Sequence, residues 1–229
     1  MEAGSQAGSS HALASANLLI FDLDGTLIDS ELDLVKSVNA TRAHMEMTPL
    51  DPALIASYVG NGAPVLIARS LAKDVDDPLV VRGLEFFLAY YREHMLDHTD
   101  LYPGVREALD AFHAAGKRMA VLTNKPVRFS QEIVAGLGLR DHFLRVYGGN
   151  SFEFKKPHPI GIQTIMGEAG AAPAQTVMVG DSAVDIRTAR AAGVFACGVS
   201  FGFQPETFVE HPPDLVVDDL RELVRLVLG

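Results

Sequence analysis

The chain has 229 residues, of which 48% are hydrophobic and 21% charged, so it can bury an ordinary core within one or two compact domains. Acidic and basic residues are interspersed, and the formal net charge is -10. This balance excludes the basic footprint of a protein that binds nucleic acid or docks on an anionic membrane. If the partner is itself an anion, its binding site must supply the positive charge.

The cysteine count and the N-terminal segment bear on the compartment. Cys197 is the only cysteine, which rules out an internal disulfide framework and fits a reducing cytoplasm. Residues 1–16 are rich in Gly, Ser and Ala, and they lack the basic and continuous apolar regions of a secretory signal. We expect a disordered tail there. No later segment is apolar for long enough to span a bilayer.

Four short apolar runs after this tail stop at a glycine or a polar residue, as strands buried on both faces of a parallel sheet do. They cover residues 18–21, 119–122, 177–179 and 195–199. The helical stretches between them cover residues 105–115, 129–137, 160–169 and 183–192. This alternation predicts an α/β fold with a doubly wound, Rossmann-like parallel sheet. Ligands of such folds bind at the carboxyl ends of the strands, so we expect Asp22, Thr123 and Asp181 to share one crevice.

The segment 31–99 breaks the alternation, because its apolar residues recur at helical spacing and prolines mark its internal turns. We expect an all-helical cap at 31–99, inserted into an α/β core formed by 17–30 and 100–229. An insert placed just after the first strand lies over the carboxyl end of that strand. It can therefore act as a lid on the crevice.

The sharpest local feature is Asp22-Leu23-Asp24-Gly25-Thr26, which directly follows the first predicted strand. Gly25 allows a turn that brings both carboxylates towards one ligand. Two nearby carboxylates repel each other unless a cation lies beside them, and a hard divalent ion such as Mg²⁺ suits oxygen ligands and phosphate. The same pattern also fits a polar loop or a calcium-type turn.

A second acidic segment, Gly180 to Asp185, ends another predicted strand. Asp181 can complete the coordination of the metal, and Asp185, about one helical turn later, can orient a metal-bound water or a lysine. Asp181 by itself also fits the N-cap of the following helix.

Groups that can bind phosphate follow the remaining strands. Thr123 and Asn124 present a hydroxyl and an amide at the end of the second core strand. Lys156 stands directly before Pro157, whose fixed φ restricts the local chain. Lys156 can then serve as a point charge for phosphate and for the attacking carboxylate. A Lys-Lys-Pro run is also common as a solvated turn.

Taken together, these segments resemble the haloacid dehalogenase superfamily, in particular its phosphatases with a small helical cap. The matching motifs, in the superfamily's order, are Asp22-x-Asp24-Gly25-Thr26, Thr123-Asn124, Lys156-Pro157 and Gly180-Asp181-Ser182-x-x-Asp185. The resemblance covers nearly the whole chain after the tail. It implies an Mg²⁺-dependent phosphatase for a small phosphorylated metabolite, either a monomer or a homodimer.

The resemblance also implies a role for each motif residue. Asp22 would attack phosphorus and form an acyl phosphate, and Asp24 would act as general acid and then as general base. The other implied roles are phosphate binding by Thr123, Asn124 and Lys156, metal binding by Asp22, the Asp24 backbone carbonyl and Asp181, and support of these ligands by Ser182 and Asp185.

Other branches of the superfamily fit less well. Dehalogenases lack the second acid, which is Asp24 here. β-Phosphoglucomutases carry a cap histidine at the position of Leu34. Phosphonatases use a cap lysine as a Schiff base, and the cap before Lys73 offers only Lys36, where we expect a surface charge.

The cap segment 58–71, which contains Gly60-Asn61-Gly62, resembles the phosphoglycolate phosphatase family. Two glycines let the backbone approach the closed site and favour a compact substrate. Arg69 can pair with a substrate carboxylate, or it can remain solvated on a cap helix. The expected reaction is hydrolysis of 2-phosphoglycolate to glycolate and phosphate. Pyrophosphate, a sugar phosphate and a nucleotide remain alternative substrates, and a non-catalytic phosphometabolite-binding protein is the alternative of another class.

Overall fold

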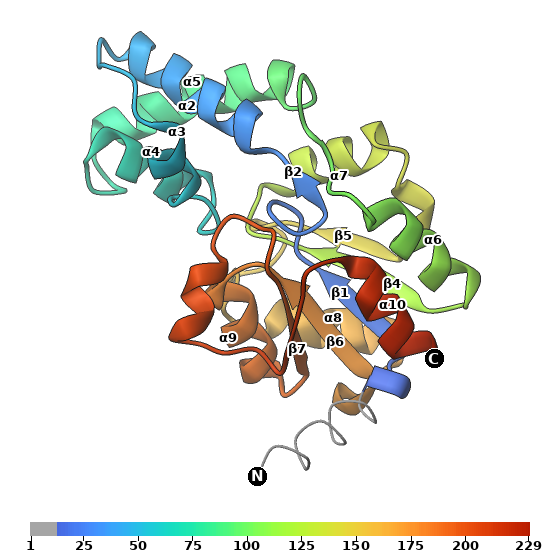
Figure 1. Cartoon of the computed structure of the whole chain (residues 1–229). Helices are drawn as coiled ribbons and strands as arrows, with labels where there is room; N and C mark the ends of the chain where they lie inside the picture. Colours follow the sequence, from blue (N-terminus) through green and yellow to red (C-terminus); the bar gives the residue numbers. More distant parts are fainter. Residues whose placement is uncertain (1–12) are drawn as a thin grey trace.

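The computed structural model describes residues 13–229, and within them a six-stranded parallel sheet forms the core (Figure 1). The strand order is β5-β4-β1-β6-β7-β8, with every pair parallel. The strands are β1 (Leu18–Phe21), β4 (Arg118–Leu122), β5 (Arg145–Tyr147), β6 (Thr176–Gly180), β7 (Phe195–Val199) and β8 (Leu215–Val217). The connections run in opposite directions on the two sides of β1, so the carboxyl end of β1 lies at the switch point where such folds bind ligands.

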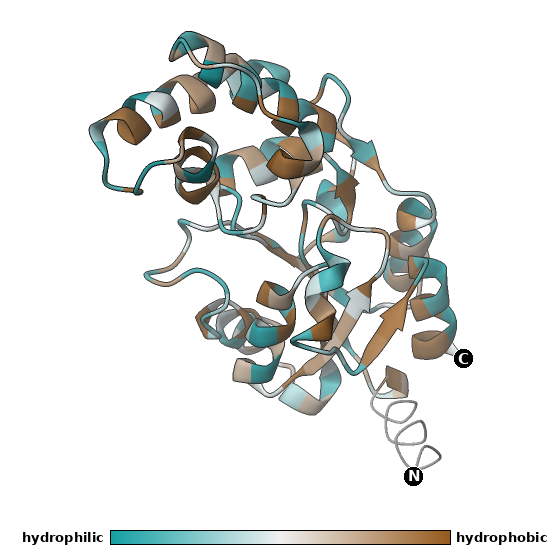
Figure 2. Cartoon of the chain, turned by 60° about the vertical axis from the view of Figure 1, so that its left-hand side comes forward, coloured by the Kyte–Doolittle hydropathy of each residue, from teal (hydrophilic) through white to brown (hydrophobic). Residues whose placement is uncertain are grey.

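Side chains of β1 alternate between two hydrophobic layers. Leu19 and Phe21 pack in the layer beneath α6, α7 and α10, whereas Leu18 and Ile20 pack beneath α8 and α9. These helices are α6 (Val105–Ala114), α7 (Val127–Gly136), α8 (Ile160–Ala169), α9 (Ala183–Ala192) and α10 (Leu220–Leu228). Because β1 is covered on both faces, each of its residues must be apolar, and Figure 2 shows the hydrophobic strands inside the core. The predicted doubly wound α/β sheet is confirmed.

The edge strands β5 and β8 were not predicted from the sequence. Each is three residues long and partly exposed, so neither carries the continuous apolar run that identified the central strands. Short 3₁₀ helices complete the core at Arg140–His142, Pro173–Gln175 and Pro205–Val209. Across residues 13–229, no helix has both the length and the hydrophobicity needed to cross a membrane.

The inserted helical cap is present as predicted. Its helices are α2 (Glu31–His44), α3 (Pro52–Ala56), α4 (Ala63–Leu71) and α5 (Pro78–His94). The chain enters and leaves the cap through two short antiparallel strands, β2 (Ile28–Asp29) and β3 (Asp100–Leu101). Pro52 and Pro78 open their helices, where a missing N–H costs nothing, and Asp51 and Asp77 cap them. Figure 1 shows the cap above the carboxyl ends of the sheet.

The predicted disordered tail, 1–16, needs a correction at its end. Residues 1–12 lie outside the described part of the chain. Leu13 and Ala16 lie within it and are buried, with 2% and 0% of their surface exposed. The N–H of Asn17 donates to the carbonyl of Gln175 at 2.9 Å. The tail therefore does not extend to residue 16, because apolar contacts and this bond fix the chain just before β1.

Asp33 joins the two chain segments that connect the cap to the core. It lies on α2, and its carboxylate accepts hydrogen bonds from the backbone N–H groups of His98 and Thr99 at 2.9 and 2.8 Å. The His98 ring and the Thr99 hydroxyl donate to the same carboxylate at 2.8 and 2.9 Å. Burial raises the pKa of Asp33, but these donors outweigh it and lower the pKa below the ordinary value of 3.8. The ionised Asp33 therefore stabilises the base of the cap.

We expect Asp33→Asn to lower the free energy of unfolding by about 1.5–3 kcal/mol at neutral pH, since several bonds to a charged acceptor weaken together. The folded pKa of Asp33 lies below the unfolded one, so its contribution is complete above the unfolded pKa of about 3.8 and is lost as the pH falls through the folded value. Denaturant unfolding from pH 7 to pH 3 measures both effects. The exposed Asp76→Asn is the matched control. A difference between D33N and wild type that does not shrink in acid would contradict this account.

Candidate active site

Asp22 lies at the end of β1, where the chain leaves the sheet. The residue is 6% exposed, and its Oδ1 accepts from the N–H of Leu23 at 2.7 Å. Gly25 then turns the chain with φ at +78°. A Cβ on Gly25 would lie 2.2 Å from Asp181 Oδ2, so only glycine lets the loop after β1 approach the end of β6.

Three buried carboxylates meet at this edge of the sheet. Oxygen atoms of Asp22, Asp181 and Asp185 all lie within 4.8 Å of one another. The sequence analysis predicted the convergence of Asp22 and Asp181 and placed Asp185 behind them, whereas the structure brings Asp185 into the same cluster. The carboxylate of Asp24, the other predicted acid, turns to a different set of partners.

Ser182, not Asp181, is the N-cap residue of α9. The hydroxyl and the N–H of Ser182 donate to Asp185 Oδ2 at 2.8 and 3.2 Å. Asp181 accepts instead from the N–H of Phe203 at 2.7 Å, which links it to the loop after β7. Asp181 thus remains directed at the acidic cluster rather than at the helix that follows it.

Lys156 is the counter-charge of the cluster. Its Nζ lies 2.9 Å from Asp22 Oδ1 and 2.6 Å from Asp185 Oδ1, with 2% of the side chain exposed. Burial raises the pKa of Asp22 to about 6, although Lys156 opposes the shift. Burial, followed by the charges of Asp185 and Asp22, raises the pKa of Asp181 well above 3.8. One lysine leaves negative charge uncompensated among three carboxylates, and such a set of hard oxygen donors fits a divalent cation.

The Asp24 side chain bonds to a lysine that the sequence analysis missed. Lys125 Nζ donates to Asp24 Oδ1 and Oδ2 at 2.9 and 3.1 Å, and to the hydroxyl of Tyr91 at 2.7 Å. Ser30 donates to Asp24 Oδ1 at 2.6 Å. The available signal was position, since Lys125 stands directly before Pro126 after a core strand, as Lys156 stands before Pro157.

Burial of Lys125 and Tyr91 affects the two side chains differently. Burial lowers the pKa of Lys125, but the Asp24 carboxylate and Tyr91 outweigh it and raise the pKa overall. Burial raises the pKa of Tyr91 to about 12, with Lys125 opposing the shift. At neutral pH the lysine is therefore a cation and the phenol keeps its proton.

Thr123 and Asn124 follow β4, as predicted, but only Thr123 leaves its side-chain hydrogen free for a ligand. The Thr123 hydroxyl accepts from the N–H of Lys125 at 3.2 Å, and no acceptor for its own hydrogen is recorded within residues 13–229. Asn124 Nδ2 donates to the carbonyls of Gly60 and Lys156 at 2.9 and 3.1 Å. The Asn124 side chain thus holds two loops together, and its predicted contact with phosphate is left to its backbone.

The predicted cap segment Gly60-Asn61-Gly62 is held against the core through its backbone. The carbonyl of Gly60 accepts from Asn124, and that of Asn61 accepts from Lys155 Nζ at 2.6 Å. Gln204 Nε2 donates to the carbonyl of Val59 at 2.8 Å. A Cβ on Gly62, where φ is +85°, would lie 3.1 Å from the Asn124 carbonyl oxygen. These contacts describe a closed cap, and Gly62 permits the close approach.

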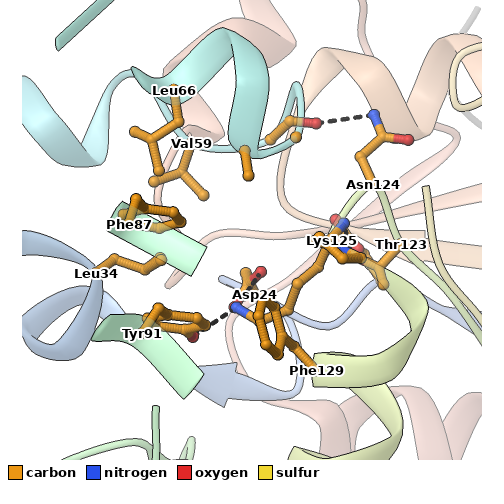
Figure 3. Close-up of a pocket in the computed structure, with 15 residues that line it drawn as sticks. Asp24, Leu34, Val59, Leu66, Phe87, Tyr91, Thr123, Asn124, Lys125 and Phe129 are labelled. Carbon is orange, nitrogen blue, oxygen red and sulfur yellow. Dashed lines mark hydrogen bonds and ion pairs between the residues drawn. The ribbon is translucent and has the colours of Figure 1, made fainter. Parts of the chain in front are cut away.

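A pocket lies between the cap and the core, with Asp22 and Asp24 among its lining residues. Its volume is about 40 Å³, where a single water needs roughly 10–15 Å³. Figure 3 shows that the apolar side chains come mostly from the cap and the polar groups mostly from the core. The apolar side chains are those of Leu34, Val59, Leu66, Phe87 and Phe129. A closed pocket of this size suits a group of few heavy atoms.

Arg69 does not line this pocket. It is exposed on α4, and its guanidinium carbon lies 5.9 Å from the centre of the Tyr58 ring. Its neighbours Ala68 and Ser70 are buried, so the helix presents Arg69 to the opposite side. Of the two alternatives drawn from the sequence, the solvated cap arginine matches this position.

The comparisons with known proteins agree with this geometry. The profile of the haloacid dehalogenase-like hydrolases matches residues 19–199, which include every predicted core site residue. The chain belongs to this family. The cap, the buried acids and Lys156 are thus parts of one hydrolase fold.

The chain is similar to relatives from this family over nearly its whole length. The chain is 41% identical over 211 residues to a phosphoglycolate phosphatase of Chromobacterium violaceum, covering 90% of this chain and 94% of the relative. It is 38% identical to a phosphoglycolate phosphatase of Colwellia psychrerythraea, with coverages of 93% and 97%. A crystal structure described as a predicted phosphoglycolate phosphatase of Haemophilus somnus superposes with a TM-score of 0.87 at 32% identity, with coverages of 93% and 98%. The protein is a phosphatase of the haloacid dehalogenase-like family.

We expect Lys156→Met to lower the free energy of unfolding by about 3–5 kcal/mol in metal-free buffer, because it leaves Asp22 and Asp185 buried without their cation. The neighbouring Lys155→Met is the matched control, since Lys155 is exposed and, within residues 13–229, its side chain donates only to the Asn61 carbonyl. It should cost about 1 kcal/mol or less. Denaturant unfolding of both variants measures the difference. Similar losses would show that the charge of Lys156 does not stabilise the cluster.

Proposed function

We propose that this phosphatase hydrolyses 2-phosphoglycolate to glycolate and phosphate in the cytoplasm, with Mg²⁺ as its cofactor and a phosphorylated Asp22 as intermediate. The observation that carries the chemistry is the position of Asp22, buried beside Lys156 at the edge of a closed pocket. The substrate rests on two supports. The relatives are phosphoglycolate phosphatases, and a pocket of about 40 Å³ suits a two-carbon group.

Asp22 is the nucleophile in the first half of the reaction. An Oδ atom attacks phosphorus, and the new O–P bond forms as the bond from phosphorus to the glycolate oxygen breaks. Lys156 lies 2.9 Å from Asp22 Oδ1, so its charge favours the ionised nucleophile and offsets negative charge on the phosphoryl oxygens. The free hydroxyl of Thr123 and the backbone N–H groups after β4 supply further donors to the phosphoryl group.

Asp24 moves the protons. In the first half it donates a proton to the departing glycolate oxygen, and in the second it takes a proton from the water that attacks the phosphorylated Asp22. The second attack releases phosphate and restores the Asp22 carboxylate. Ser30 and Lys125 hold the Asp24 side chain through hydrogen bonds of 2.6 to 3.1 Å, which keep it beside the pocket.

The acidic cluster would hold the metal ion. Asp22, Asp181 and the backbone carbonyl of Asp24 are the proposed ligands, and Asp185, bonded to Lys156 and Ser182, orients the groups around them. When bound, Mg²⁺ supplies positive charge that stabilises the phosphoryl group during transfer. The protein's own part is to keep these oxygens together in a dry site, which burial and Gly25 achieve.

The alternative substrates need different binding partners in the pocket. A sugar phosphate or a nucleotide brings several hydroxyls or a base, and the apolar walls offer these groups few partners. Inorganic pyrophosphate is small, but its second phosphoryl group carries more charge than a carboxylate, and among the described residues that line the pocket Lys125 is the only lysine or arginine. The pocket therefore favours 2-phosphoglycolate among the four candidates.

A panel of 2-phosphoglycolate, pyrophosphate, glucose 6-phosphate and a nucleoside monophosphate tests the substrate with purified protein. We expect the highest kcat/KM for 2-phosphoglycolate in Mg²⁺ and no turnover after chelation with EDTA. Preference for another compound would reject the substrate and leave the phosphatase reaction in place. Full activity in EDTA would reject the metal. Binding of the phosphate esters without any hydrolysis would support the non-catalytic alternative.

Substitution of the two acids should separate their roles. Asp22→Asn removes the nucleophile, and we expect it to abolish turnover and the acid-stable trapping of phosphate on the protein. Asp24→Asn should lower kcat by about 10²–10⁴ with a smaller effect on substrate binding, because proton transfer belongs to the transition state. Rapid-quench kinetics measures both variants, with the exposed Asp76→Asn as control. Unchanged kcat in D24N would contradict its role.

A further inference from the structure

The substrate pocket contains one strongly polar corner besides the acids. Among the described residues that line it, Lys125 is the only lysine or arginine, and it is 6% exposed. Lys125 belongs to the core loop after β4, whereas its partner Tyr91 belongs to α5 of the cap. In Figure 3 the ends of both side chains meet next to Asp24, where a dashed line joins them.

The hydrogen-bond pattern leaves the hydrogen of the Tyr91 hydroxyl available at this corner. Lys125 Nζ donates to the Tyr91 hydroxyl at 2.7 Å, so the phenol oxygen is an acceptor in that bond. Within residues 13–229, no acceptor is recorded for the phenol's own hydrogen. A buried donor without an acceptor is costly, and an oxyanion placed beside Lys125 would accept from it.

Packing fixes the direction of the Tyr91 ring. The ring stacks on Phe87, with centres 5.5 Å apart and planes 6° apart, and it meets the Phe129 ring edge-on at 5.5 Å. Lys125 Nζ lies 4.6 Å from the centre of the same ring. These contacts hold the hydroxyl at the polar corner before any ligand arrives, so little ordering remains to be done on binding.

We propose that Lys125 and Tyr91 form the receptor for the substrate's carboxylate, at the end of the molecule that does not react. The inference rests on the proposed function. With phosphorus at Asp22 and the bridging oxygen at Asp24, the two-carbon group extends into the pocket, where Lys125 and Tyr91 are the donors and the other walls are largely apolar. Lys125 Nζ already donates to three acceptors, so the carboxylate would take the place of its longest bond, the one of 3.1 Å to Asp24 Oδ2. It would then receive a charge-assisted bond from Lys125 on one oxygen and a neutral bond from Tyr91 on the other.

The other cations near the cap are worse placed. Arg69 is exposed against Tyr58, outside the pocket. Lys155 donates to the Asn61 carbonyl and does not line this pocket. Because Lys125 comes from the core and Tyr91 from the cap, a carboxylate bound by both also ties the two parts together. Substrate binding would then favour the closed cap.

The test compares 2-phosphoglycolate with 2-hydroxyethyl phosphate, which has nearly the same size but no carboxylate. Wild type should prefer 2-phosphoglycolate. In Lys125→Met, kcat/KM for 2-phosphoglycolate should fall about 10- to 100-fold more than kcat/KM for the hydroxyethyl ester, with the extra loss mainly in KM. Some loss on both esters is expected, because Lys125 also holds Asp24.

A second variant avoids the risk that Lys125→Met fails to fold with Asp24 unpaired. Tyr91→Phe keeps the ring stack and removes only the hydroxyl, and it should reduce the preference for 2-phosphoglycolate about 3- to 15-fold. Tyr90→Phe is the matched control, since Tyr90 packs against Phe86 and His94 and does not line the pocket. Its preference should equal that of wild type.

The possible outcomes are distinct. A selective loss on 2-phosphoglycolate in K125M or Y91F supports the receptor. Equal losses on both esters would show that Lys125 acts only through Asp24, and would overturn the receptor while leaving the proposed function intact. A wild-type enzyme with no preference for 2-phosphoglycolate would reject the proposed substrate, and the carboxylate receptor with it.

Discussion

Burial of three carboxylates beside a single lysine is the constraint on which the rest of the site depends. Asp22, Asp181 and Asp185 come from two strand ends and the start of a helix, and Lys156 bridges the first and the last of them. Burial raises the pKa of Asp22 to about 6 against the opposing charge of Lys156, so the lysine favours the ionised form of Asp22. In the proposed reaction, the remaining negative charge of the cluster would bind a divalent cation.

The cap completes the site through backbone contacts and not through charged side chains of its own. Asn124, Lys155 and Gln204 of the core all donate to carbonyls of the cap segment 57–62. Backbone carbonyls are present whatever the side chains, so among the side chains of this segment the closure depends on the room that glycine leaves at position 62. At the other end of the cap, Asp33 fixes the two connecting segments.

The proposed specificity site lies at one place where the core and the cap meet. Lys125 lies on the core and Tyr91 on the cap, and their hydrogen bond links the two parts beside Asp24. In the proposal above, contacts of this pair therefore depend both on closure of the cap and on the ligand in the pocket. The apolar walls also disfavour substrates with several hydroxyls, since each substrate hydroxyl that lies there without a hydrogen-bond partner weakens binding. The family supplies the reaction, and this corner is where the choice of substrate is expected to lie.

The amino-acid sequence alone was enough to predict the central strands, the inserted helical cap and the polar residues at the strand ends, because a strand buried on both faces must be apolar along its whole length. Edge strands β5 and β8 escaped, since partial exposure relaxes that requirement. The direction of several side chains became known only from the folded structure. Asn124 bonds to the cap loop, Arg69 is exposed to solvent, and Lys125 bonds to Asp24. Such choices depend on partners that are distant in sequence and become neighbours only when the chain has folded.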